Sequence, residues 1–274
     1  TIINWNIPVP GGVTLQNAQP SAVRATKATT AFPDLDIPVM ATSACTGPDY
    51  GNVTIPYSSS KYYLDPGTYD SINQTNWTEV VFNPGLYCIK PNGNVNLAQR
   101  NVIANNTQFY FMGAGSFMKT NTESLTMNNS SIYLTNGDFI ISGGVSATAN
   151  NITVYVKQGN ITISGNSPVV MTAPNCDNSS CGVGPAIKGV LFYMDKTNTS
   201  GIMSISGSSS LSMEGTIFAP SSKIVVAGRS GLTTLKSQII ARRIEASGSS
   251  AIRLDLTGAN LYSPASAGSI ELLK

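Results

Sequence analysis

Apolar and polar residues alternate along most of the chain, in short runs separated by glycine and asparagine. Two such runs are Ile152-Thr-Val154-Tyr-Val156 and Ile161-Thr-Ile163. A period of two residues is the pattern of a β-strand with one buried face, and the Gly/Asn punctuation marks the turns between strands. β-Branched residues and glycine dominate these runs, so the pattern predicts many short strands and no long helix.

The runs repeat along the chain. Three stretches align without gaps and read NNTQFYFMGAGSFMKTN, NNSSIYLTNGDFIISGG and NNITVYVKQGNITISGN, at positions 105–121, 128–144 and 150–166. Glycines recur at one constant spacing, at Gly93, Gly115, Gly137 and Gly159. At this constant spacing of 22 residues Tyr110 corresponds to Ile132 and Val154, whereas Phe111 corresponds to Tyr133 and Tyr155.

A repeat unit of about 22 residues cannot bury its apolar face alone, but stacked units can. Each strand then pairs with its equivalent one coil along, at about 4.8 Å. We therefore predict an all-β fold, a right-handed parallel β-helix (β-solenoid) with coils of about 22 residues.

The N-terminal segment 1–60 shows no clear repeat and is rich in proline. Proline is poorly tolerated in central strands, and the end of a solenoid needs a cap. We predict an irregular N-terminal cap or extended arm over residues 1–60, packed on its own solenoid or on that of a neighbour. Residues 61–274 are predicted to form the β-solenoid domain, with a disulfide loop near 176–181 and a C-terminal cap.

Composition excludes several classes of function. The chain has no histidine, which removes every mechanism that needs an imidazole as base, nucleophile or metal ligand. Charged residues are only 11% of the chain and the net charge is +2, with scattered basic residues, so no nucleic-acid partner is indicated. No apolar run is long enough to span a membrane. The first residue is Thr1, so we expect a processed protein or a fragment.

The four cysteines favour disulfides over a metal site. Without histidine or a CxxC pair a zinc site is poorly supported, and we expect bridges Cys45–Cys88 and Cys176–Cys181. The alternative is four buried thiols. Disulfides indicate an oxidising compartment, so we expect a secreted or cell-surface protein. About ten Asn-x-Ser/Thr sequons occur, which are weak evidence for glycosylation; candidate sites are Asn73, Asn76, Asn151, Asn160 and Asn198.

No catalytic, metal or cofactor site emerges from the pattern. Solenoid enzymes that act on polysaccharides place carboxylates on adjacent coils, but Asp138 aligns with Ser116 and Asn160. We therefore expect no enzyme. Phe111, Tyr133 and Tyr155 form an aromatic row with one ring in each repeat, which would stack on sugars if exposed or form a second packed layer if covered.

Several short motifs resemble, in their order, the repetitive extracellular region of bacterial TadG-like proteins of tight-adherence (Flp) pilus clusters. The resemblance spans roughly residues 45–255 and is carried by segments 82–88, 171–174, 189–195, 215–220 and 238–241, which read FNPGLYC, MTAP, GVLFYMD, GTIFAP and QIIA. It implies a secreted or envelope-anchored β-solenoid linked to adherence, without known catalysis.

From these observations we expect a non-catalytic extracellular structural or adhesive protein of the bacterial cell surface, pilus-associated or self-assembling into a homo-oligomer or filament. A carbohydrate-binding adhesin module that recognises surface glycans is the alternative. A polysaccharide-degrading β-helix enzyme is the third hypothesis.

Overall fold

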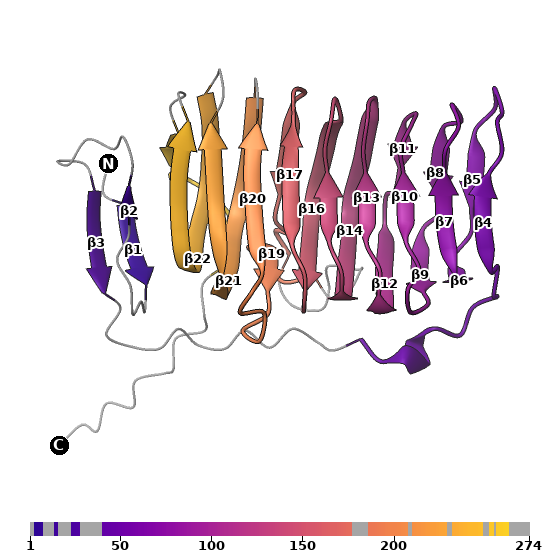
Figure 1. Cartoon of the computed structure of the whole chain (residues 1–274), viewed down its shortest axis with the longest axis horizontal. Helices are drawn as coiled ribbons and strands as arrows, with labels where there is room; N and C mark the ends of the chain where they lie inside the picture. The colour runs from indigo at the N-terminus through magenta and orange to yellow at the C-terminus, as the bar shows by residue number, and fades with distance from the viewer. Residues whose placement is uncertain are drawn as a thin grey trace.

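The computed structural model shows a parallel β-solenoid, as the repeat predicts (Figure 1). It describes residues 3–7, 14–15, 23–27, 40–176, 186–207, 210–228, 232–248, 252–254 and 256–262. The strands stack side by side along the long axis, and every pairing in the large sheet is parallel (Figure 1). The only helical element in these ranges is a short 3-10 helix, η2 (Thr42–Ala44).

Each coil has three sides, because the strands fall into three ladders. Side 1 contains β4 (Asn52–Ile55), β7 (Ser71–Gln74), β10 (Val95–Leu97), β13 (Phe117–Lys119), β15 (Phe139–Ile141), β17 (Ile161–Gly165), β20 (Ile202–Gly207) and the last parts of β21 (Ser210–Gly228) and β22 (Leu232–Gly248). Side 2 contains β5 (Tyr62–Leu64), β8 (Val80–Phe82), β11 (Val102–Ile103), the first parts of β14 (Ser124–Asn136) and β16 (Ser146–Val156), β18 (Val169–Thr172), the first parts of β21 and β22, and β23 (Ile252–Leu254). Side 3 contains β6 (Gly67–Tyr69), β9 (Gly85–Ile89), β12 (Thr107–Ala114), the second parts of β14 and β16, β19 (Val190–Met194), and the middle parts of β21 and β22.

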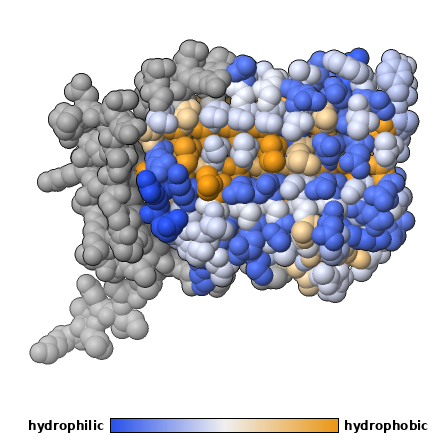
Figure 2. Space-filling model, viewed as in Figure 1, coloured by the Kyte–Doolittle hydropathy of each residue, from blue (hydrophilic) through white to orange (hydrophobic). Residues whose placement is uncertain are grey.

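The core is the inside of this three-sided tube. The apolar residue of each alternating pair points inward, as in β15, where Phe139 and Ile141 are fully buried on either side of the half-buried Ile140. Aromatic rings form a column through the core, and their centroids lie 5.0–6.3 Å apart, from Tyr50 through Tyr69, Tyr87, Phe109, Phe117, Phe139 and Phe192. On one outer face a narrow hydrophobic band runs along the long axis between rows of more hydrophilic residues (Figure 2).

The recurring glycines form a column where adjacent coils approach most closely. A Cβ on Gly115 would lie 1.9 Å from the carbonyl oxygen of Gly93, and a Cβ on Gly137 would lie 1.9 Å from that of Gly115. A Cβ on Gly159 would lie 2.1 Å from the carbonyl oxygen of Gly137. Only glycine fits at such distances, which explains why this residue recurs once in each coil.

The paired asparagines of the repeat form two hydrogen-bonded ladders at the corner between side 2 and side 3. Asn128 Nδ2 donates to Asn105 Oδ1 at 2.9 Å, and Asn150 Nδ2 donates to Asn128 Oδ1 at the same distance. Their neighbours Asn106, Asn129 and Asn151 all have positive φ and form a second ladder. Asparagine suits this corner for two reasons. It tolerates a left-handed backbone conformation, and its side-chain amide can both donate and accept a hydrogen bond.

The start of the chain lies at the far end of the solenoid. Thr14 and Leu15 of β2 (Thr14–Leu15) pair in parallel with Glu245 and Ala246 of β22, while β1 (Ile3–Ile7) and β3 (Val23–Lys27) pair with each other. The pairing of β2 with β22 occurs within one chain. At the other end the solenoid begins at β4, before the boundary we expected at residue 61.

The glycine column predicts a large loss of stability from one methyl group. Gly137→Ala would force Cβ onto the Gly115 carbonyl at a φ of +156°, so we expect the free energy of unfolding to fall by about 2–4 kcal/mol in urea titrations. Gly144→Ala in the same coil is the control. Its nearest neighbour would be 3.4 Å away, and we expect a change below about 0.5 kcal/mol. Equal effects of the two substitutions would contradict this explanation.

Candidate functional site

The aromatic row differs by one residue from the row that the sequence alignment predicts. Tyr110, and not Phe111, pairs with Tyr133 and Tyr155, whereas Phe111 pairs with Leu134 and is fully buried in the core. The expectation for Phe111 is therefore wrong.

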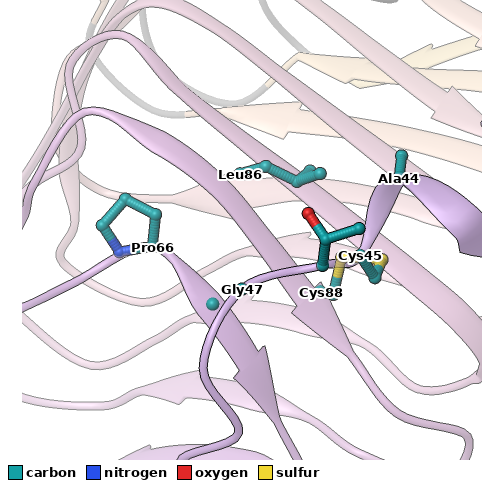
Figure 3. Close-up of a pocket in the computed structure, with 8 residues that line it drawn as sticks. Ala44, Cys45, Gly47, Pro66, Leu86 and Cys88 are labelled. Carbon is teal, nitrogen blue, oxygen red and sulfur yellow. A yellow bond between two sulfur atoms is a disulfide. The ribbon is translucent and has the colours of Figure 1, made fainter.

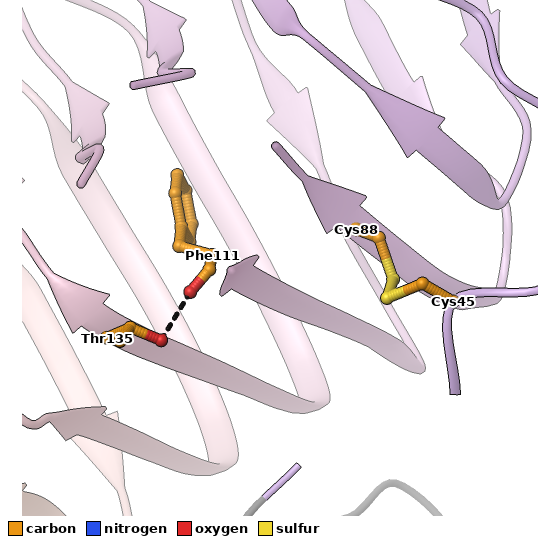
Figure 4. Close-up of a disulfide and its surroundings, with 4 residues drawn as sticks. All are labelled: Cys45, Cys88, Phe111 and Thr135. Atoms are coloured by element: carbon orange, nitrogen blue, oxygen red, sulfur yellow. Dashed lines mark hydrogen bonds between the residues drawn. A yellow bond between two sulfur atoms is a disulfide. The ribbon is translucent and has the colours of Figure 1, made fainter. Parts of the chain in front are cut away.

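The reason is a β-bulge in β12. The register shifts between Phe111 and Ala114, where two residues oppose the single residue Thr135 of β14. The Thr135 hydroxyl donates to the Phe111 carbonyl oxygen at 2.6 Å, at the point of the shift (Figure 4). Before the bulge equivalent positions in these two coils are separated by 23, and after it they are separated by 22. An alignment that assumes one constant period places the row incorrectly.

The corrected row is covered and forms a second packed layer. Tyr110, Tyr133, Tyr155 and Tyr193 are each at most 5% exposed. Their rings form a column on the outer face of side 3, with centroids 4.3–5.4 Å apart. Tyr110 meets Tyr133 edge to face, the later pairs are stacked, and Phe218 continues the column at 5.1 Å from Tyr193. Apolar residues outside the repeat pack against this layer, among them Met40, Cys45, Ile187 and Tyr262. Tyr133 and Tyr155 therefore offer no ring face to a sugar.

One tyrosine of the column, Tyr155, is hydrogen-bonded to a carboxylate. Tyr155 Oη donates to Asp195 Oδ2 at 2.6 Å. Burial and this hydrogen bond raise the pKa of Tyr155. Burial alone would raise the pKa of Asp195, but hydrogen bonds from Tyr155 and from the backbone and hydroxyl of Thr197 hold it below its usual value. The contact fixes one tyrosine in the layer and keeps the carboxylate ionised.

The other carboxylates aligned with the repeat have structural partners. Asp138 Oδ1 accepts from the Asn160 backbone N–H at 2.7 Å, one coil along, and Glu214 Oε1 accepts from the Asn260 N–H at 2.9 Å. In the part of the chain that the structure describes, no three Cys, Asp or Glu side chains come close enough to hold a metal ion.

The Cys45–Cys88 disulfide is present, as expected (Figure 4). It ties the segment before β4 to β9, across a sequence separation of 43. A small open pocket beside it is lined by Gly47, Pro66, Gly67, Leu86 and neighbours of Cys45, without a charged side chain (Figure 3). Cys176 is also disulfide-bonded, whereas Cys181, its expected partner, lies outside the described residues.

The candidate glycosylation sites differ in access. Asn73 and Asn76 are half-buried and Asn151 is exposed, although the Asn151 amide belongs to the ladder. The Asn160 amide donates to Asp138 at 3.1 Å. Asn198 is fully buried and its Nδ2 donates to the Gly159 carbonyl at 2.8 Å, so a glycan cannot be attached there in the folded chain.

The sequence analysis missed a buried lysine. Lys119 points into the core between Leu97 and Ile141 of the neighbouring coils and is fully buried. Its Nζ donates to the carbonyl oxygens of Thr122, at 2.9 Å, and of Gln99. Burial lowers the pKa of Lys119 to about 8. The signal was present in the repeat, because a lysine aligned with isoleucine on an inward position has to be buried.

The sequence analysis also missed the exposed aromatic residues. Tyr57, Tyr63 and Trp77 are 75%, 59% and 52% exposed, and Arg100 lies over the Trp77 ring with Cζ 5.7 Å from the centroid. Tyr57 and Trp77 lie on corner loops between side 1 and side 2, outside the strands that the alignment used. Tyr50, Tyr57, Tyr63 and Trp77 are the aromatic residues that are exposed among those whose burial is described.

Lys119 predicts an unusual pH dependence of stability. Its pKa in the folded chain is about 8, against about 10.4 for an unperturbed lysine. Unfolding between these values takes up a proton, so the free energy of unfolding should rise from about pH 8 to about pH 10.4. Urea titrations at several pH values should show this rise in the wild type and lose it in Lys119→Met. Lys157→Met, which changes an exposed lysine, should keep it. The same pH profile in all three proteins would show that Lys119 is not the cause.

We compared the chain with known proteins in three ways. No family model matches it, and neither a curated protein nor a solved structure does. The function is therefore argued from the geometry of this chain.

Proposed function

We propose that this chain is a non-catalytic structural and adhesive protein of the bacterial cell surface. The observation that carries the proposal is the continuity of the rod. Parallel pairing, the asparagine ladders and two aromatic columns connect each coil to the next. Such a structure resists bending and holds a binding surface at a distance from its point of attachment.

The disulfide supports a location outside the cytoplasm. Disulfides persist in oxidising environments outside the cytoplasm, and Cys45–Cys88 joins two segments of this chain. Among the residues described here, no helix is both long and apolar enough to cross a membrane. The order of motifs that resembles TadG-like proteins supports the same proposal and adds a link to pilus-associated adherence.

Carboxylates in structural roles favour a scaffold over an enzyme. Asp138, Asp195 and Glu214 lie on the solenoid, and each is engaged by a neighbouring coil or segment. These hydrogen bonds give each carboxylate a structural role between coils or segments, which supports a scaffold.

Carbohydrate binding is the second candidate function, and the exposed aromatic residues support a site other than the row proposed from the sequence. The tyrosine row on side 3 is covered, but the corner that carries Tyr57 and Trp77 is open to solvent. This corner is the basis of the further inference below.

Surface location can be tested directly on intact cells of the source bacterium. A membrane-impermeant biotin reagent should label the exposed lysines Lys61 and Lys157 while a cytoplasmic marker protein remains unlabelled. Labelling of this chain only after lysis would contradict the proposal.

Self-association is a separate expectation, because side 1 and side 2 end at β4 and β5, whose outer edges pair with no described strand. Sedimentation velocity should show species larger than a monomer that increase with concentration. Thr54→Pro, on the edge strand β4, should reduce them because proline cannot donate to an added strand. Thr54→Val retains the backbone N–H and is the matched control. A single monomeric species at high concentration would contradict this expectation.

A further inference from the structure

The aromatic residues whose side chains are described as exposed all lie in the first coils of the rod. Of the large hydrophobic side chains described as exposed, the aromatic ones are Tyr50, Tyr57, Tyr63 and Trp77, all in the first coils. Between residue 78 and residue 262 the exposed large hydrophobic residues in the described ranges are aliphatic. Exposed aromatic side chains that lie close together on a surface are typical of interaction sites.

Three residues of this region lie on successive corner loops between side 1 and side 2. Tyr57 belongs to the loop between β4 and β5, Trp77 to the loop between β7 and β8, and Arg100 to the loop between β10 and β11. Because the strands on either side of these loops pair coil on coil, the three loops follow one another along the rod at about 4.8 Å per coil. We call Tyr57, Trp77 and Arg100 the aromatic corner.

The corner loops are held by buried hydrogen bonds. The Ser58 backbone N–H donates to Thr78 Oγ1 at 2.7 Å, and Thr78 Oγ1 donates to the Pro56 carbonyl at 2.8 Å. Gln74 Nε2, itself fully buried, donates to the Thr78 carbonyl at 2.6 Å. The loop that carries Trp77 is therefore fixed to the loop that carries Tyr57, and ordering them on ligand binding costs little free energy.

The charge at the corner is positive. Lys61 and Glu79 neutralise each other in an ion pair of 2.7 Å. Arg100 has no carboxylate partner among the described residues, and its guanidinium lies over the Trp77 ring. A stacked guanidinium keeps its N–H donors free at its edge, where they match the two oxygens of a carboxylate.

We propose that the aromatic corner binds an acidic polysaccharide, a chain of pyranose rings that carry carboxylate groups. The apolar C–H face of a sugar ring would stack on Tyr57 and on the open part of Trp77, while Arg100 takes the carboxylate in a bidentate contact. Ser59, Ser60 and Thr75 are exposed on the same loops as Tyr57 and Trp77, and their hydroxyls suit the hydroxyls of a sugar. This inference rests on the adhesive role proposed above and names the class of ligand.

The test uses the full chain with polygalacturonate and alginate as probes and neutral dextran as the comparison, in a binding titration at low salt. We expect both acidic polymers to bind and dextran to bind at least tenfold more weakly. Trp77→Ala and Arg100→Ala should each weaken binding of the acidic polymers at least tenfold. Arg100→Lys keeps the positive charge but loses the planar guanidinium that makes the bidentate contact. Its affinity for the acidic polymers should lie between that of Arg100→Ala and that of the wild type. Binding should also weaken as salt rises.

Two substitutions at exposed positions away from the corner serve as matched controls. Arg242→Ala removes an exposed arginine from the opposite end of the rod, where its Nε donates to the Ser221 carbonyl at 3.0 Å. Ile202→Ala removes an exposed aliphatic side chain from side 1. Both should bind like the wild type. Thermal unfolding of every variant distinguishes a lost contact from a lost fold.

The proposal is overturned if neither acidic polymer binds the wild-type chain, or if Trp77→Ala and Arg100→Ala bind as well as the controls do. It is also overturned if Trp77→Ala leaves glycan binding intact and instead abolishes self-association, since the corner would then be a contact between copies. Surface labelling without glycan binding would remove this inference alone and leave the proposed function standing.

Discussion

Coils separated by about 4.8 Å of parallel β-pairing are the constraint on which the rest of this structure depends. At that separation each side chain lies directly against its equivalent in the next coil, so every position in the coil has to suit a column of similar residues. Glycine is required where backbones nearly touch, as at Gly115 and Gly137. Asparagine is favoured where amides can bond to amides, as at Asn105, Asn128 and Asn150. Aromatic rings form columns because they can stack at this spacing.

The same constraint explains the low charge. A charged residue repeated on successive coils would face its own charge at close range, and such pairs are destabilising. The chain therefore has 11% charged residues and uses hydroxyl and amide groups as its polar surface. Two exceptions are informative. Lys119 is buried between aliphatic residues of the two neighbouring coils, so no like charge lies next to it. Its ammonium group donates to backbone carbonyl oxygens at a corner of the coil. Arg100 is exposed singly, over a tryptophan and without an acidic partner among the described residues.

A rod of this kind separates its stability from its surface chemistry. The inward residues and the ladders determine the stability, so corner loops can vary without altering the core. The aromatic corner illustrates this freedom, because Tyr57, Trp77 and Arg100 lie on loops of different length that stack on a regular sheet. A binding surface placed on such loops is supported by the rigid sheet below it.

The fold class could be predicted from the sequence alone. The alternation within the runs and the constant spacing between them identify stacked coils, because both come from local backbone geometry and from repetition. The sequence also identified the Cys45–Cys88 bridge. A constant spacing of 22 residues placed the tyrosine row incorrectly, since one extra residue at the Phe111–Ala114 bulge shifts the register, as the pairing with β14 shows. Which outer faces are covered is known only from the tertiary structure. Segments distant in sequence bury the tyrosine row, and β2 pairs with β22 at the far end of the solenoid. The corner that carries Trp77 is exposed. Burial of an outer face depends on which distant segment packs there, and a local pattern does not encode that choice.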